Sequence, residues 1–357
     1  MLKSLKTLHG EISLPTFFPD GTLGVVKGVD SKDLENANIE GLVINAYHLI
    51  VSSADAKGSA DMHKLMNWNR PIITDSGGFQ VMSLIHRNPN MGKIKDDEVV
   101  FTAEEGKRLV LTPEKSIQAQ LNLGADITIT LDDCTMPDQS EEVQENSVER
   151  TLKWAKRSKN EFDKLTEKMA KKPLIFAVVQ GGNNKKLRAE CARELIKMNF
   201  DGYCYGGFPV DSEGNFLSEI LEYTASLLPG DKPKYAMGVG RPENIVECTR
   251  MGYSMFDCVI PTREARHRKL YIFNQNSENF NMNEKDFYST IYIQSGKFEK
   301  DSGPISKYCD CHTCKNYSRA YLRYLFKIGD TLAVRLATIH NLRFYTQLLE
   351  NLKRLQG

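Results

Sequence analysis

The stretch LIFAVVQGGNNKKLRAECARELIKMNFDGYCYGG (174–207) decides the fold, because it holds a strand, a helix and a second strand in one short unit. Residues 174–180 and 202–206 are β-rich runs, typical of buried strands. Between them Leu187, Cys191 and Leu195 recur at four, the spacing of one helix face. A helical crossover joins parallel strands, so the stretch predicts a strand–helix–strand unit of a parallel sheet.

The same alternation of strand and helix recurs along the chain. The β-rich runs are 22–29, 41–47, 71–75, 126–132, 174–180, 202–206, 234–239 and 255–260. Eight runs over roughly 260 residues favour a (β/α)8 TIM barrel over an open doubly wound sheet, which usually has fewer strands. Residues 9–15 predict a small hairpin lid, and 148–169 an amphipathic helix; after about residue 275 the alternation ends.

Composition sets the class of protein. The 357 residues are 41% hydrophobic and 26% charged, which excludes a disordered chain. No apolar run approaches the roughly 18 residues that a membrane helix needs, and the first residues lack the apolar stretch of a secretory signal. We therefore expect a soluble, cytoplasmic protein.

Positive charge is concentrated near the C-terminus. Residues 315–357 carry eight Lys/Arg and two Asp/Glu, a balance of +6, so the remainder carries −5 of the total +1. Arg319, Arg323 and Lys327 recur at four on one helix face, and 263–269 holds a second basic cluster. Such surfaces suit a polyanion; the alternative is an ordinary solvated face.

Three carboxylates stand where predicted strands end. Asp75 and Asp132 each close a β-rich run, the run 255–260 contains Asp257, and glycine pairs follow other runs. The catalytic groups of a TIM barrel lie at this end of the strands. The three predict acid/base and nucleophilic chemistry at an electrophilic carbon, as in retaining glycoside cleavage. The alternative for each Asp is a turn or helix cap.

Three of the eight cysteines predict a metal site. The others are single, and we expect reduced thiols at Cys134, Cys191, Cys204, Cys248 and Cys258. Cys309-x-Cys311-x2-Cys314 offers three thiolates in one tight turn, and His340 or His312 is the candidate fourth ligand of a structural zinc. Three ordinary buried cysteines are the alternative. No His-x-His or His-x3-His occurs, so catalytic zinc is not expected.

Several strings together resemble the queuine tRNA-ribosyltransferase (tRNA-guanine transglycosylase) family. They span most of the chain in order: NAYHL (45–49), DSGGFQ (75–80), LGADI (123–127), VQGG (179–182), MGVG (237–240), FDCVIPTR (256–263), the cysteine cluster, YSRAYLR (317–323) and IHNLRFY (339–345). The resemblance implies a (β/α)8 barrel, 1–290, with an N-terminal hairpin lid, and a C-terminal zinc-binding subdomain, 291–357, whose basic helices contact tRNA.

The resemblance also implies the reaction, which is a pentosyl transfer in queuosine biosynthesis. The wobble guanine of tRNAs with a guanine-first anticodon is exchanged for a free 7-deazaguanine. Asp257 is the implied nucleophile, which forms a covalent ribosyl ester, and Asp75 the general acid/base. For the base, the resemblance places Asp132 on the amidine edge, and Gln180 and the Gly207 N–H on the carbonyl. Phe79 and Met237 hold the two ring faces.

Further implied features concern the metal, the tRNA and the assembly. Arg263 and Arg266 are expected to hold tRNA near the wobble nucleotide, and a homodimer is expected. The implied zinc ligands are Cys309, Cys311, Cys314 and His340.

The chain departs from the family pattern beside the predicted base site. Most bacterial members have GGLAVGE where this chain has GGFPVDS (206–212), so the glutamate that recognises an aminomethyl group is absent. Asp211 and Glu213 are candidates to replace it. The family uses a flip of the peptide at this place to present an N–H donor to the base, and Pro209 has no N–H. Val210, where queuine users tend to have glycine, favours the smaller 7-aminomethyl-7-deazaguanine; queuine is the alternative.

Two other readings compete with a transglycosylase. A non-catalytic tRNA-binding partner subunit would have lost active-site residues, whereas both Asp75 and Asp257 are present. Asp133 stands where the family usually has a glutamate, a departure that bears on the identity of the free base and not on this alternative. A retaining glycosidase predicts sugar-stacking tryptophans at the barrel mouth, but Trp68 and Trp154 fall in a predicted loop and helix.

Overall fold

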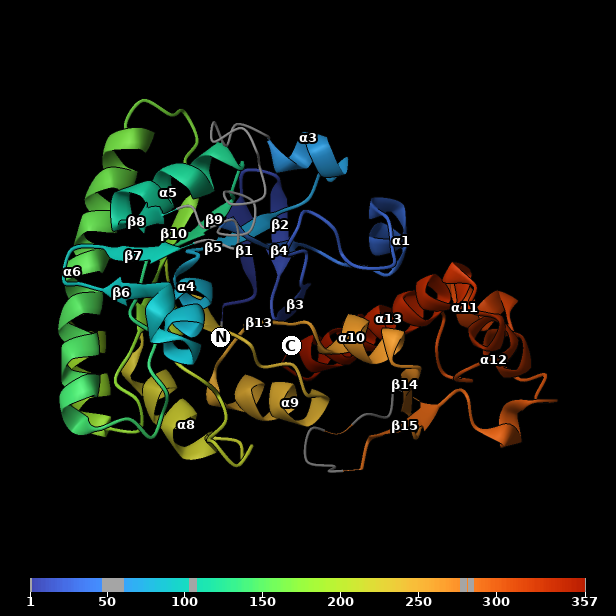
Figure 1. The fold of residues 1–357 in the computed structure, drawn as a ribbon. Coiled ribbons are helices and arrows are strands. Elements are labelled where there is room, and N and C mark those ends of the chain that lie inside the picture. Colours follow the sequence, from blue (N-terminus) through green and yellow to red (C-terminus); the bar gives the residue numbers. More distant parts are fainter. Residues whose placement is uncertain (1, 47–60, 103–107, 277–280, 282–285, 357) are drawn as a thin grey trace.

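A nearly closed parallel barrel forms the centre of the computed structural model (Figure 1). The structure describes residues 2–46, 61–102, 108–276, 281 and 286–356. Within them the sheet order is β3-β13-β12-β11-β10-β9-β5-β4, and neighbouring strands are parallel. The strands are β3 (Thr16–Pro19), β4 (Leu42–Asn45), β5 (Ile72–Asp75), β9 (Ile127–Ile129), β10 (Leu174–Val179), β11 (Gly202–Tyr205), β12 (Lys234–Ala236) and β13 (Met255–Cys258). The predicted (β/α)8 barrel is confirmed.

The barrel closes between β3 and β4, where one sequence prediction was wrong. Asp20 forms a single parallel bridge with Val43, beyond the last residue of β3. The predicted strand 22–29 is instead a series of turns, because Gly24 and Gly28 adopt left-handed φ values of 72° and 90°. The first strand is the fully buried run Thr16–Pro19, which was too short and too rich in flanking proline to be detected.

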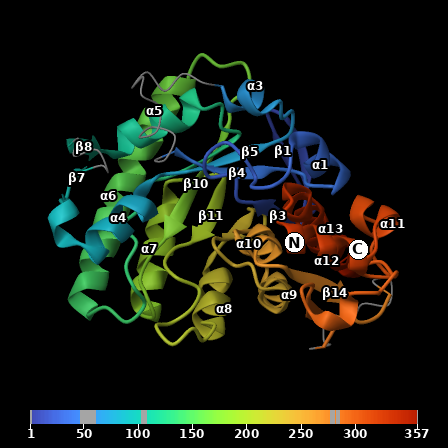
Figure 2. The ribbon, with the colours of Figure 1, turned by 45° about the vertical axis from the view of Figure 1, so that its right-hand side comes forward.

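Helices follow the strands and surround the barrel (Figures 1 and 2). They are α1 (Ser31–Asn36), α3 (Met62–Met66), α4 (Gly78–Arg87), α5 (Pro113–Asn122), α6 (Glu141–Thr166), α7 (Lys185–Lys197), α8 (Ser218–Leu227), α9 (Pro242–Met251) and α10 (Ile260–Arg266). The helix predicted over 148–169 is the long α6, which ends at Thr166. Local signals set the other ends: the Thr112 hydroxyl caps α5, and Gly252 ends α9 at φ 103°.

The last helix completes the ring of helices around the barrel. α13 (Thr331–Gln356) packs against α10, β3, α9 and α1, which is the place of the helix between the last and first strands. It also contacts α11 (His312–Asn316) and α12 (Arg319–Ile328), which lie on the opposite side of the molecule from α6 (Figures 1 and 2). The C-terminal segment is therefore attached to the barrel through α13.

The hairpin of β1 (Ser4–Thr7) and β2 (Gly10–Ser13) closes the N-terminal end of the barrel. Ile12 and Leu14 belong to the apolar cluster inside the strands, and His9 reaches Asp126 at the start of β9. The predicted hairpin lid therefore covers the end opposite to the one where Asp75 and Asp257 stand.

Two smaller sheets are attached to the barrel. β6 (Gly92–Ile94), β7 (Val99–Thr102) and β8 (Arg108–Leu111) form an antiparallel sheet beside α4, and β14 (Lys269–Phe273) pairs with β15 (Tyr288–Tyr292). Residues 277–280 and 282–285, just after the point where the alternation of strand and helix was predicted to end, lie outside the described residues. Among the described helices, none has the length and apolar character needed to span a bilayer.

Candidate active site

A pocket of about 580 Å³ lies at the carboxyl ends of the barrel strands. Seven of the predicted site residues line it: Asp75, Phe79, Asp132, Gly207, Met237, Asp257 and Arg263. Gln180 is fully buried behind this lining, and Arg266 also lies outside it. Residues 47–49 of the NAYHL string lie outside the described part of the chain.

Asp75, the last residue of β5, is surrounded by N–H donors. Its Oδ2 accepts hydrogen bonds from Asn45 Nδ2 at 2.6 Å and Gln80 Nε2 at 3.1 Å, and its Oδ1 accepts from the Ala46 and Gly77 N–H groups at 3.2 Å. Burial raises the pKa of Asp75 to about 7, against these donors, and the charge of Asp257 adds to the increase. Such a carboxyl exchanges a proton near neutral pH, as a general acid/base requires.

Asp257 on β13 faces the same pocket with fewer donors. Its Oδ1 accepts a hydrogen bond from the Gly238 N–H at 2.9 Å, and the buried Tyr235 hydroxyl also bonds this carboxylate. Burial raises the pKa of Asp257 to about 6, the two hydrogen bonds lower it and the nearby charge of Asp20 raises it. The carboxylate is therefore mostly ionised at neutral pH and can act as a nucleophile.

Asp132 and Gln180 form a hydrogen-bonded pair on neighbouring strand ends. Gln180 Nε2 donates to Asp132 Oδ2 at 2.6 Å, and burial raises the pKa of Asp132 to about 7. The Gln180 Oε1 atom is buried and has no hydrogen-bond partner within the described part of the chain. Of the pair, Asp132 lines the pocket, so its carboxylate is placed to meet a polar edge of a ligand.

Apolar side chains form the walls of the pocket. Phe79 is 46% exposed and lies 5.5 Å from Phe208, centroid to centroid. Met237 and Val210 also line the pocket. An exposed aromatic ring and a methionine in one pocket suit a flat heterocycle.

The carboxylates of the divergent loop bind within the loop itself. Asp211 accepts hydrogen bonds from the backbone N–H groups of Glu213 and Asn215 and from Asn215 Nδ2. Glu213 Oε2 also accepts from Asn215 Nδ2, at 3.3 Å. Neither acidic residue lines the pocket, whereas Phe208, Pro209 and Val210 do. In this conformation, neither candidate replacement for the missing glutamate lines the pocket predicted to bind the base.

Two further charged residues, Asp133 and Arg188, form buried contacts beside the ends of β9 and β10. Asp133 pairs with Arg150 of α6, and its buried charge contributes to the raised pKa of Asp132. Arg188 is 1% exposed and donates to the carbonyls of Gly182 and Val179, which holds the turn that follows β10. These contacts fix the backbone around Gln180.

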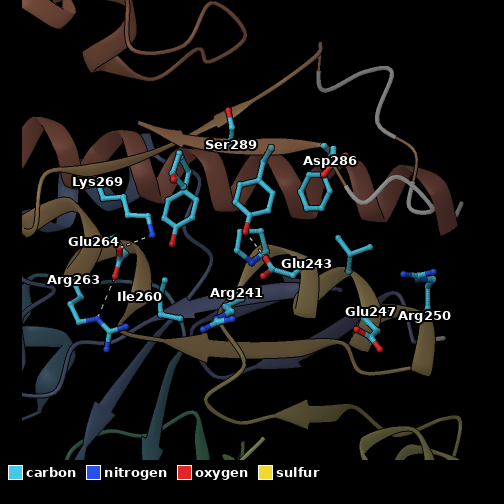
Figure 3. Close-up of a pocket in the computed structure, with 16 residues that line it drawn as sticks. Arg241, Glu243, Glu247, Arg250, Ile260, Arg263, Glu264, Lys269, Asp286 and Ser289 are labelled. Atoms are coloured by element: carbon cyan, nitrogen blue, oxygen red, sulfur yellow. Dashed lines mark hydrogen bonds and ion pairs between the residues drawn. The ribbon is translucent and has the colours of Figure 1, made fainter. Parts of the chain in front are cut away.

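A groove of about 890 Å³ between α9, α10 and the β14–β15 hairpin adjoins the pocket (Figure 3). Arg241, Ile260 and Arg263 line both. Glu264 lies between Arg263 and Lys269, at 3.7 Å and 3.4 Å, in loose ion pairs that leave both cations partly exposed (Figure 3). The groove thus offers cations next to the pocket. Arg266 instead donates to Thr262.

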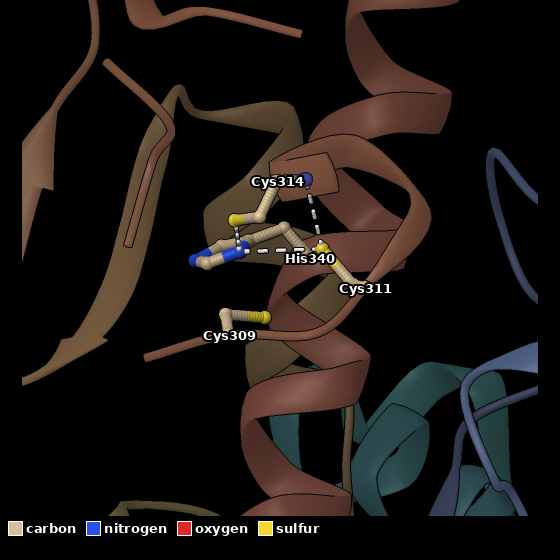
Figure 4. A group of neighbouring side chains, drawn as sticks. All are labelled: Cys309, Cys311, Cys314 and His340. Atoms are coloured by element: carbon tan, nitrogen blue, oxygen red, sulfur yellow. Dashed lines mark hydrogen bonds between the residues drawn. The ribbon is translucent and has the colours of Figure 1, made fainter. Parts of the chain in front are cut away.

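The cysteine cluster gathers around one histidine of α13 (Figure 4). The ligand atoms of Cys309, Cys311, Cys314 and His340 lie within 4.8 Å of one another. His340 Nδ1 is 3.3 Å from Cys314 Sγ and 3.7 Å from Cys311 Sγ, and its Nε2 is 2.7 Å from the Tyr271 carbonyl. Three sulfurs around a histidine whose second nitrogen is held by a carbonyl match a closed tetrahedral metal site.

The competing histidine lies elsewhere. His312 is exposed, and its Nδ1 faces Asn316 Nδ2 at 3.2 Å. It is not part of the four-residue group. The geometry therefore selects His340, because α13 passes directly behind the cysteine turn.

Among the pocket residues that were not predicted as site residues from the sequence, four lie next to Asp75 or Asp257. Asn45 and Gln80 bind Asp75, Tyr235 binds Asp257, and Asp20 lines the mouth beside it. Asn45 and Gln80 fall within the strings that carry the family resemblance, which was the available signal. Asp20 and Tyr235 carried none, because each becomes a site residue only when β3, β12 and β13 are neighbours.

Comparison with known proteins places the chain in a family. The family model described as queuine tRNA-ribosyltransferase matches residues 2–355. The chain is 41% identical over 350 residues to a queuine tRNA-ribosyltransferase of Mannheimia succiniciproducens, which covers 97% of this chain and 86% of that protein. Proteins of the same name from Actinobacillus pleuropneumoniae serotype 3 and Shewanella sediminis are each 40% identical, over 346 and 348 residues, covering 96% and 97% of this chain and 85% and 86% of theirs. The chain therefore belongs to the queuine tRNA-ribosyltransferase family, a family of pentosyltransferases.

Proposed function

We propose that this protein exchanges the wobble guanine of tRNAs with a guanine-first anticodon for a free 7-deazaguanine, through a covalent ribosyl ester on Asp257. The observation that carries the proposal is the presence of Asp75 and Asp257 in one pocket, with different hydrogen-bonding environments. Family membership supports the reaction class.

In the first half-reaction, an oxygen of Asp257 attacks C1′ of the guanosine and the C1′–N9 bond breaks. The electron pair of that bond leaves with guanine, which takes a proton from Asp75. An oxocarbenium-like centre is stabilised by a carboxylate on the face opposite the leaving group, as in retaining glycosidases. Guanine departs and leaves ribose esterified to Asp257.

In the second half-reaction, the free base occupies the same pocket and transfers its N9 proton to Asp75. N9 then attacks C1′, the ester bond breaks and the electron pair returns to Asp257. The same carboxyl acts as acid and then as base, so a pKa near 7 suits Asp75 in both steps. The order of events is ping-pong.

Base recognition uses the residues behind the catalytic pair. Asp132 accepts from the amidine edge, while the Gln180 amide and the Gly207 N–H meet the carbonyl. In the structure, Gln180 donates its amide N–H to Asp132. When a base binds, the Gln180 amide either turns toward the carbonyl of the base or acts on the base only through its hydrogen bond to Asp132. Phe79 and Met237 enclose the ring, as expected for a base flipped out of its stack.

The incoming base is proposed to be 7-aminomethyl-7-deazaguanine. Val210 lines the pocket, and its side chain limits the size of the 7-substituent. Queuine, with its larger substituent, is the alternative. Direct comparison of the two free bases decides between them.

The remaining proposals concern the metal and tRNA. The four residues Cys309, Cys311, Cys314 and His340 fit a structural zinc ion, which would hold the cysteine turn against α13. Arg263 and Arg266, with the cations of the adjoining groove, bind the anticodon region. A homodimer in the cytoplasm, and a boundary between a catalytic part, 1–290, and a zinc-binding part, 291–357, remain predictions.

The test is release of radiolabelled guanine from a tRNA with a guanine-first anticodon, chased separately with 7-aminomethyl-7-deazaguanine and with queuine. We expect release with the aminomethyl base. Release with queuine alone would overturn the assignment of the base. Absence of release with either base, and with guanine itself, would favour a non-catalytic partner subunit.

A further inference from the structure

A fourth carboxylate lies at the mouth of the catalytic pocket. Asp20 follows β3 directly and forms the bridge with Val43 that closes the barrel. It lines the pocket together with Thr22, Asp75 and Asp257. Neither the nucleophile nor the general acid/base requires a third acidic group beside them.

The strand order places Asp20 on the ribose side of the pocket. β3 pairs with β13, where Phe18 is opposite Asp257, and β4 and β5 follow on the other side with Asn45 and Asp75. The residues proposed to bind the polar edges of the base and one of its faces, Asp132, Gln180, Gly207 and Met237, follow β9, β10, β11 and β12, on the remaining arc of the barrel. Phe79, proposed for the other face, follows β5. Asp20 therefore faces the substrate where its sugar is held between the two catalytic carboxylates.

One carboxylate oxygen of Asp20 holds the side chain in place, and the other is available to accept a hydrogen bond. Its Oδ1 accepts hydrogen bonds from the Thr22 N–H at 3.0 Å and from the Thr22 hydroxyl. Within the described part of the chain, no residue donates a hydrogen bond to Oδ2. Its negative charge also raises the pKa of Asp257, so it lies near enough to affect the nucleophile.

Within the sugar and phosphates of an internal ribonucleotide, only one group can donate a hydrogen bond to this carboxylate. The phosphates on either side are anionic and repel it. The 3′ and 5′ oxygens are esterified in a polynucleotide chain, so the 2′-hydroxyl is the sole hydroxyl donor of the ribose. The 2′-carbon is also bonded to C1′, which Asp257 attacks.

We propose that Asp20 accepts a hydrogen bond from the 2′-hydroxyl of the nucleotide whose base is exchanged. This inference rests on the proposed transglycosylase function. Hydrogen bonds to the 2-hydroxyl strengthen in oxocarbenium-like transition states, so the contact assists cleavage as well as binding. Because the 2′-hydroxyl is what distinguishes RNA from DNA at a given site, Asp20 selects a ribonucleotide target.

The test compares two anticodon stem-loop RNAs that differ in one atom, with guanosine or 2′-deoxyguanosine at the target position. The zinc-loaded wild-type protein and the variants Asp20→Ala and Asp20→Asn are assayed for kcat/KM of guanine exchange. We expect the wild type to lose about tenfold or more on the deoxy substrate, as for a hydrogen bond to a charged group. Asp20→Ala should lose a similar factor on the ribo substrate and show no further loss on the deoxy substrate.

A second readout separates contact with the substrate from a structural role. Asp20→Asn keeps the size of the side chain and removes its charge, so the pKa of Asp257 should fall. In a plot of kcat/KM against pH, the loss of activity at low pH (the acidic limb), which reports protonation of Asp257, should then move to lower pH. Asp330→Ala is the matched control, because Asp330 binds the N–H of Leu332 as Asp20 binds that of Thr22, far from the pocket. It should leave discrimination between the two RNAs and the pH profile unchanged.

The outcomes are distinct. Equal losses on both RNAs in Asp20→Ala, with an unmoved acidic limb in Asp20→Asn, would overturn the contact while the transglycosylase function stands. Failure of the wild type to exchange guanine in either RNA would refute the proposed function and this inference with it.

Discussion

Asp75 and Asp257 differ in their surroundings, and this difference agrees with the roles proposed for them. Asp75 has four N–H donors and a pKa raised to about 7, whereas Asp257 has the Gly238 N–H and the Tyr235 hydroxyl and a pKa of about 6. When two titratable groups in one site are held at different pKa values, the lower one supplies the anion and the higher one the proton. The geometry therefore agrees with Asp257 as nucleophile.

Replacement of the nucleophile gives the first prediction. Asp257→Asn keeps the size of the side chain and its contact with Gly238, but the amide cannot form the ribosyl ester. Exchange should fall by about 10⁴-fold or more, as for loss of a covalent nucleophile. Guanine release and tRNA binding are measured on the same preparation. Normal turnover would rule out Asp257, and loss of tRNA binding would point to misfolding.

The two pKa values predict a bell-shaped dependence of kcat/KM on pH. Activity should fall below about pH 6 as Asp257 becomes protonated, and above about pH 7 as Asp75 loses its proton. Gln80→Met removes a donor that stabilises the ionised form of Asp75, so its pKa should rise further. The alkaline limb should then move to higher pH, while the acidic limb remains.

A matched variant controls for loss of a glutamine. Gln118 donates to Glu161 at 2.7 Å on the outer helices, and Gln118→Met should leave both limbs unchanged. If the alkaline limb does not move in Gln80→Met, the loss of activity at high pH does not report the deprotonation of Asp75.

At the scale of elements, the hairpin of β1 and β2 is fastened to the barrel by one carboxylate. Asp126, which precedes β9, accepts hydrogen bonds from the backbone N–H groups of His9 and Ile72. The imidazoles of His9 and His63 also contact its carboxylate oxygens, at 3.0 Å and 3.2 Å. His63 Nδ1 also faces the Trp68 carbonyl and its Nε2 the Gly124 carbonyl. Acceptors at both nitrogens favour the charged imidazolium.

This arrangement predicts a stability that depends on pH. Burial opposes charge on His63, yet its hydrogen bonds to Asp126 and the carbonyls hold its pKa above 6.5, so its contribution is present below pH 6.5 and is lost as the pH rises through the raised value. The pKa of Asp126 is lowered, so its contribution is present above pH 3.8 and is lost as the pH falls through the lowered value. The pair stabilises the fold most between these two limits.

Asp126→Asn should destabilise the protein by about 2–4 kcal/mol, since it leaves a buried imidazolium without its partner. The decrease in the thermal midpoint should be larger near pH 6 than near pH 8.5, where His63 is neutral in a larger share of molecules. Asp163→Asn, which removes an exposed pair with Lys159, should change the midpoint little at either pH. An equal loss for Asp126→Asn at both pH values would contradict a charged His63.

The sequence predicted the order of strands and helices because periodicity and capping are local. Thr112 and Gly252 act at the helix ends where their types predict, and the run 174–180 contains β10. The first strand was placed wrongly because the turns after Thr16–Pro19 contain valines that resemble a strand. Asp20 and Tyr235 depend on which strands become neighbours, and this requires the closed barrel.

At the scale of the whole molecule, α13 joins the cysteine cluster to the barrel. The Tyr345 hydroxyl donates to the Gly240 carbonyl beside the pocket, and Asn341 binds the backbone of Pro261, Lys269 and Tyr271. His340 lies on the same helix, one residue before Asn341. We therefore expect a change at the cysteine cluster to affect the groove between α9, α10 and β14.

The chain offers a matched pair of histidines to test this coupling. His340→Ala removes a ligand that lies among three sulfurs, so zinc content should fall from about one to well below one per chain. The thermal midpoint and affinity for the anticodon stem-loop should fall with it, because the cysteine turn and α13 lose their common anchor. His312→Ala alters an exposed ring outside the group and should retain zinc, midpoint and affinity. Metal content is measured by elemental analysis and affinity by titration of labelled RNA. Loss of zinc in His312→Ala with retention in His340→Ala would reverse the ligand assignment. Loss of zinc without any change in RNA affinity would show that α13 holds the groove in place unaided.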